Sequence, residues 1–121
     1  MMLIYVGAFF LVAWGIAHLF PTQSVVKGFG DISIDNQRII TMEWIIEGVS
    51  LIFIGAIVAL VTFVDSASPA SKSIYWAVFV MLNALSVISL LTGFKISFIP
   101  FKLCPVIFTT SSILILAGSF L

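Results

Sequence analysis

The sequence is poor in charged residues, which already excludes several classes of protein. It has five Lys or Arg and five Asp or Glu among 121 residues, so charged residues make up 8% and the net charge is zero. Hydrophobic residues account for 62% and the mean hydropathy is +1.31, whereas soluble domains contain roughly 45 to 50% apolar residues. This composition excludes a soluble globular domain, and the zero net charge predicts no nucleic-acid partner.

Cysteine and histidine each occur once, as Cys104 and His18. A single cysteine excludes an intrachain disulfide and every paired-cysteine redox or zinc motif. A single histidine excludes a haem ligated by two histidines of one chain. The sequence therefore predicts no metal site and leaves any cofactor unknown, and redox chemistry would require a borrowed cofactor.

Four apolar segments are separated by residues that interrupt helices. A transmembrane helix needs about 20 mostly apolar residues, and all four segments approach or exceed this length. The first lacks the positively charged start of a secretory signal, so we interpret it as a retained helix. Pro21, "DSASPAS" and "GFKISFIP" separate the segments. The sequence predicts one all-α integral membrane domain, residues 1–121, a four-transmembrane-helix bundle with up-down-up-down order and helices at about 2–20, 36–64, 74–94 and 101–121.

The connections between these helices carry further signals. The longest, residues 21–33, contains apolar residues and Lys27 and is interpreted as a short interfacial helix. Asp35 is a candidate N-cap for the second long helix. Tyr75 and Trp76, at the start of the third, are typical of an aromatic belt at a membrane surface. Because the connections after the second and third helices are short, we expect the second, third and fourth to be antiparallel neighbours.

The distribution of Lys and Arg predicts the orientation in the membrane. Short cytoplasmic loops carry an excess of these residues. Lys27, Arg38, Lys95 and Lys102 lie in or beside two connections, and only Lys72 lies in the other. We therefore expect a multi-pass protein of the inner (plasma) membrane, with both termini on the non-cytoplasmic side and the loops at residues 21–38 and 95–101 in the cytoplasm.

Two acidic residues, Glu43 and Glu47, lie within the second apolar segment in "MEWIIEG". They are four residues apart and so share one face of a helix, whereas Trp44, Gly48 and Gly55 form a face for close helix packing. A charge near the bilayer centre costs on the order of 2.5 to 3.5 kcal/mol. At least one of the two carboxyl groups is therefore expected to be protonated or partnered at neutral pH.

His18 is the nearest candidate partner, because it ends the first helix at a depth similar to that of Glu43. Trp14 lies one turn away on the same face, and Asn83 lies near the middle of the third helix. We expect these side chains to line one buried polar core shared by all four helices. The alternative interpretations are that Asn83 ties two helices together and that His18 donates to a loop carbonyl. The candidate ligand-binding or proton-relay residues are Glu47, Glu43, His18, Asn83 and Trp14.

Three functions fit this inventory of residues. The first is binding or passage of a small lipophilic or cationic ligand, or of a proton, through the polar core. The size and layout are similar to small multidrug transporters, but their essential glutamate lies in the first helix, which has no acid here. The second is an intramembrane enzyme or a quinone-linked redox subunit, so enzymatic activity stays open. The third is an accessory subunit. The expected partners are the lipid bilayer and either further copies of the chain or a larger complex.

The segment "WGIAHLFP", residues 14–21, ends the first helix. Its Gly, His and Pro resemble the end of the first helix in DoxX-like small membrane proteins. This resemblance implies a four-helix membrane fold. The DoxX-like group includes quinone-linked redox subunits, so the resemblance implies no single activity.

Overall fold

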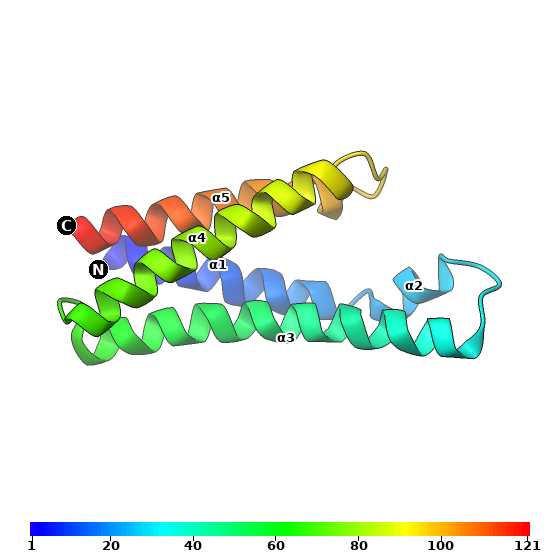
Figure 1. Cartoon of the computed structure of the whole chain (residues 1–121), viewed down its shortest axis with the longest axis horizontal. Coiled ribbons are helices and arrows are strands. Elements are labelled where there is room, and N and C mark those ends of the chain that lie inside the picture. The colour runs from blue at the N-terminus through cyan, green and yellow to red at the C-terminus, as the bar shows by residue number, and fades with distance from the viewer.

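The computed structural model describes all 121 residues and contains five helices and no strand (Figure 1). Four of the helices are long and apolar enough to span a membrane, and the fifth is a short helix in the first connection. The prediction of an all-α chain with four helices of membrane-spanning length is confirmed. The helices are α1 (Met2–Leu19), α2 (Thr22–Lys27), α3 (Ile34–Asp65), α4 (Pro69–Thr92) and α5 (Ile99–Phe120).

Helix α3 begins at a serine cap and not at the predicted Asp35. The side chain of Ser33 accepts a hydrogen bond from the N–H of Asn36 at 3.1 Å. This bond satisfies one of the N–H groups that have no partner within the helix. Asp35 lies in the first turn, where its negative charge is favourable at the positive end of the helix dipole.

Helix α4 begins ahead of the predicted residue 74 because Ser68 caps it. Tyr75 is therefore inside the helix and completely buried, with its hydroxyl 2.7 Å from the hydroxyl of Thr62 on α3. The prediction that Tyr75 lies in an aromatic belt is wrong, since this residue joins α3 to α4 near their shared turn. Trp76, the next residue, is 49% exposed.

The connection between α1 and α3 contains the expected short helix, α2. The hydroxyl of Thr22 donates to the carbonyl of Leu19 at 2.6 Å and so satisfies one of the last carbonyls of α1. After α2 the chain turns at Gly30, the only residue with a positive φ, at 76°. Glycine adopts this backbone conformation without steric cost.

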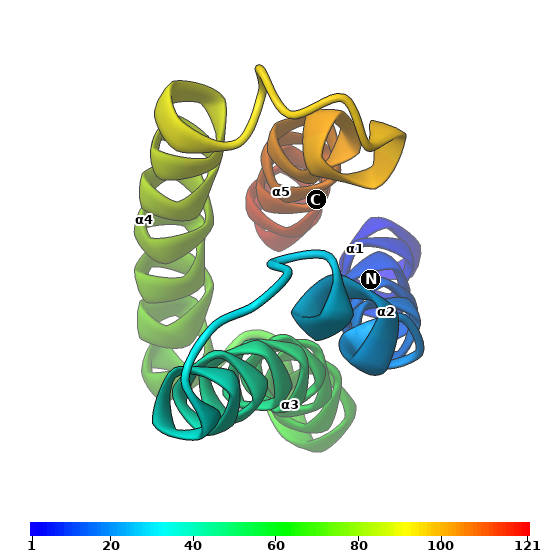
Figure 2. The same ribbon diagram turned by 90° about the vertical axis from the view of Figure 1, so that its right-hand side faces the viewer.

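The order of the helices in space differs from their order in the chain. Helix α1 packs against both α3 and α5, and α4 packs against α5. Figure 1 shows α4 leaving α3 at their shared turn and running obliquely toward the N-terminal end of α5. Figure 2 shows the same arrangement end-on. The prediction that α3 and α4 are neighbours holds only near that turn, because α1 occupies the packing face of α3.

Glycines let α1 approach α3 closely. A Cβ atom on Gly15 would lie 2.7 Å from the carbonyl oxygen of Gly48, and one on Gly55 would lie 2.7 Å from the carbonyl oxygen of Ala8. Small residues at such positions allow two helix backbones to approach without side chains between them. The predicted packing face at Gly48 and Gly55 is confirmed, and its partner is α1.

The buried core lies where α1 and α5 contact the other long helices. Many large hydrophobic side chains on the outer faces of the four long helices are exposed, as expected for helices surrounded by lipid. Both termini lie at one end of the bundle, and α2 and the α4–α5 connection lie toward the other (Figure 1). The core consists of Ile4, Ala8, Leu11, Leu51, Val58, Tyr75, Val78, Leu82, Phe108 and Ile115.

Candidate functional site

A cavity lies among α1, α3, α4 and α5, beside the α4–α5 connection. Its volume is about 510 Å³, within the range of roughly 300 to 1,000 Å³ of small-molecule sites. It is formed on the side where α4 diverges from α3, so all four long helices contribute to its wall. The lining is mostly apolar and aromatic, and its polar side chains include His18 and Glu47.

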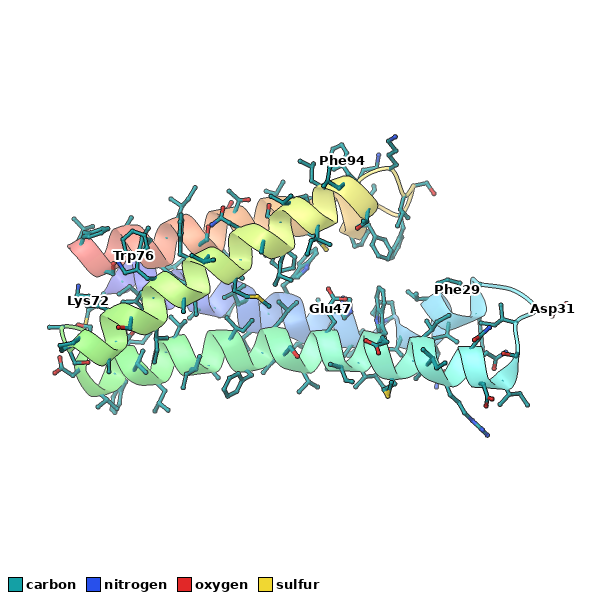
Figure 3. The ribbon with its side chains drawn as sticks, in the orientation of Figure 1. Phe29, Asp31, Glu47, Lys72, Trp76 and Phe94 are labelled. Atoms are coloured by element: carbon teal, nitrogen blue, oxygen red, sulfur yellow. The ribbon has the colours of Figure 1, made fainter.

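His18 and Glu47 meet in this cavity. The Nε2 atom of His18 lies 3.4 Å from the Oε2 atom of Glu47. The His18 side chain is 8% exposed and its Nε2 atom has no hydrogen-bond partner, whereas the Glu47 side chain is 51% exposed. In Figure 3, Glu47 points from α3 toward the space between α3 and the other long helices. The two groups are thus close enough for electrostatic attraction, and the exposed Glu47 carboxylate keeps hydrogen-bonding capacity for a third partner.

Trp44 holds the His18 ring in place. The two rings are stacked, with centroids 3.9 Å apart and planes inclined by 17°. The Nε1–H group of Trp44 also donates to the backbone carbonyl of His18 at 2.7 Å. That carbonyl is among the last four of α1, which have no N–H partner within the helix. One indole therefore caps α1 and fixes the orientation of its histidine.

Trp14 and Cys104 also line the cavity, from α1 and α5. The indole of Trp14 lies beside the thiol of Cys104, whose sulfur is 3.4 Å from the carbonyl oxygen of Pro100. Both side chains are partly buried. Trp14, predicted as a site residue, thus shares the cavity with His18 and Glu47.

Glu43 lies outside the cavity. Its side chain is exposed and has no ion-pair or hydrogen-bond partner. The expectation that His18 lies at the depth of Glu43 is wrong by one helical turn, because the close contact of Gly15 with Gly48 sets the register of α1 on α3. This register places His18 beside Glu47.

Asn83 also lies away from the cavity, in the contact between α4 and α5. Its side-chain amide donates to the carbonyl of Phe79 at 2.7 Å and to the hydroxyl of Ser112 at 3.1 Å. One turn along, the hydroxyls of Ser86 and Thr109 are 2.7 Å apart. The prediction of one polar core that includes Asn83 is wrong, since these groups are paired with each other across two helices.

Sequence reasoning missed two residues of the site. Trp44 was assigned to the packing face, and Cys104 was considered only for disulfides and metal motifs. The spacing of Trp44 and Glu47 contained a usable signal, because residues three apart on a helix are neighbours on its surface. No comparable signal marked Cys104, because its position depends on how α5 packs against α1.

The residues of the site do not form a metal-binding cluster. No group of three His, Cys, Asp or Glu side chains is placed to hold a metal ion. Comparison with protein-family models, with curated proteins and with solved structures finds no match to this chain.

Proposed function

We propose that this chain is a multi-pass membrane protein that binds a small lipophilic molecule in the cavity between its four long helices. The observation that carries the proposal is the His18–Glu47 pair facing a cavity of about 510 Å³ with a mostly apolar lining. Ligand sites in proteins combine an apolar wall with a few polar groups that fix the orientation of the ligand. The pair supplies the polar groups, and Trp14, Trp44 and Phe108 supply part of the wall.

The position of the cavity supports entry of a ligand from the membrane. Helices α3 and α4 both form part of the cavity wall, and they contact each other only near their shared turn. Both helices expose large apolar side chains. A lipophilic molecule partitions from water into the bilayer, from which the opening between α3 and α4 would give it access to the cavity.

The cationic residues support an orientation with the cavity toward the cytoplasm. Lys27 ends α2, and Lys95 and Lys102 belong to the α4–α5 connection and the start of α5, at the end of the bundle beside the cavity. Lys72 lies toward the opposite end (Figure 3), where its amino group donates to the carbonyl of Ser119. This distribution favours cytoplasmic loops at residues 21–38 and 95–101, with both termini on the other side of the inner (plasma) membrane.

Tryptophan fluorescence tests ligand binding directly. The chain has three tryptophans, of which Trp14 and Trp44 line the cavity and Trp76 does not. In the Trp76→Phe protein in detergent, an uncharged bromophenyl-alkane should quench the remaining fluorescence in a saturable manner. Ala17→Phe, which places a ring in the cavity, should weaken this binding about tenfold, a loss of about 1.4 kcal/mol.

Ala56→Phe is the matched control, because Ala56 is exposed on α3 and does not line the cavity. Quenching that rises without saturation, and equally in both phenylalanine variants, would show partition into detergent and contradict the proposal. In that case, isolation of the chain only within a larger assembly would favour the role of an accessory subunit.

A further inference from the structure

The charges that face the cavity come from few groups. Glu47 on α3 is the only acidic residue in the lining, and no Lys or Arg is part of it. The other titratable groups are His18 on α1 and Cys104 on α5, and α4 contributes none. An anionic ligand would be repelled by the Glu47 carboxylate, and an uncharged ligand would gain no electrostatic attraction from it.

The cavity also presents aromatic faces and an accessible carboxylate. About half of the Glu47 side chain is exposed, whereas His18 is almost fully covered. Several rings surround the space beside them, and the face of an aromatic ring attracts a cation within about 6 Å of its centroid. A carboxylate together with aromatic faces is an environment that suits an organic cation. The rings belong to Trp14, Trp44, Phe98, Phe101 and Phe108.

We propose that the ligand of this cavity is a lipophilic organic cation, with Glu47 as its counter-ion. This proposal rests on the proposed function, that the cavity binds a small molecule.

Three probes of the same shape test the choice of ligand. They are a bromophenyl-butyl trimethylammonium ion, its uncharged carbon analogue and the corresponding sulfonate, each titrated against the Trp76→Phe protein. The cation should bind about tenfold more tightly than the uncharged analogue. The sulfonate should bind more weakly than both.

Two glutamine variants locate the counter-ion. Glu47→Gln should reduce the affinity for the cation to that for the uncharged analogue and leave the latter unchanged. Glu43→Gln removes the same charge one helical turn away, outside the cavity, and should change neither affinity. If Glu47→Gln does not fold, the comparison of the three probes on the parent protein still decides the charge preference.

Equal affinity for the cation and the uncharged analogue would overturn the cation proposal and leave the proposed function standing. Saturable binding of none of the probes would overturn the proposed function itself.

Discussion

At the scale of single residues, Trp44 has the most connected position in the site. Its ring stacks on His18, its Nε1–H group caps the His18 carbonyl, and its edge meets Phe101 with centroids 5.7 Å apart. These contacts join α1, α3 and α5 at one point. Trp44 is therefore expected to stabilise the bundle and to orient His18 toward Glu47.

Trp44→Phe removes the hydrogen bond and keeps an aromatic ring to stack on His18. We expect the free energy of unfolding to fall by about 1 kcal/mol, because a carbonyl in an apolar environment loses its donor. Thermal unfolding in detergent, followed by circular dichroism, measures the change. Trp76→Phe is the control, since the aromatic contacts of Trp76 are with Phe79 and Phe120, at the other end of the bundle. Equal stability of the two variants would show that the cap contributes nothing.

At the scale of elements, the register of α1 on α3 decides which residues meet. The close backbone contact at Gly15 and Gly48 places His18 one turn further along α1, beside Glu47. The same register leaves the first turns of α3 beyond the end of α1, where α2 packs instead. Glu43 belongs to that protruding part and stays exposed.

Gly15→Ala tests this contact. Alanine is normally a better helix former than glycine, but here its methyl group would meet a backbone carbonyl that cannot move aside. We expect the free energy of unfolding to fall by about 1–3 kcal/mol, as for overpacked cores. Ligand affinity should fall too, because α1 must shift relative to α3. Ser50→Ala, at an exposed position on α3, should change stability by less than about 0.5 kcal/mol. An unchanged or raised unfolding temperature for Gly15→Ala would contradict the role of this contact.

At the scale of the whole molecule, the arrangement of the helices creates the cavity. Helix α4 is tied to α3 at the turn by Tyr75 and Thr62 and is tied to α5 along its length by the bonds of Ser86 and Asn83. It therefore diverges from α3 and leaves space beside Glu47. Most of the Lys and Arg residues lie at the end of the molecule near this space, and this distribution favours a cytoplasmic location for that end.

Cysteine labelling in cells tests the orientation. In a Cys104→Ser background, Lys95→Cys should react with a membrane-impermeant maleimide only when the cytoplasmic face is exposed, as in inverted vesicles. Ala67→Cys, at an exposed position in the α3–α4 turn, should react only from the outside of intact cells. The reverse pattern would invert the proposed topology, and labelling of both sites from one side would contradict a membrane-spanning arrangement.

The sequence by itself determined the class of the protein. Long apolar segments in a chain with few charges favour helices. In lipid, the backbone N–H and C=O groups have no water to bond to, and a helix pairs them within one segment. The segment limits followed from Pro21 and the two polar stretches, to within a few residues. The errors at Asp35 and Tyr75 arose because serine caps lie just outside the apolar runs, where hydropathy gives no signal.

Only the tertiary structure decided which polar residues meet. Sequence spacing orders residues around one helix, but the register and rotation between two helices depend on side-chain volumes along the whole contact. The contact of Gly15 with Gly48 selected Glu47 over Glu43 as the partner of His18. The bonds between α4 and α5 withdrew Asn83 into a different contact. The sequence therefore contained the acids, the histidine and the tryptophans, and the packing of α1 against α3 and α5 gathered some of them into one cavity.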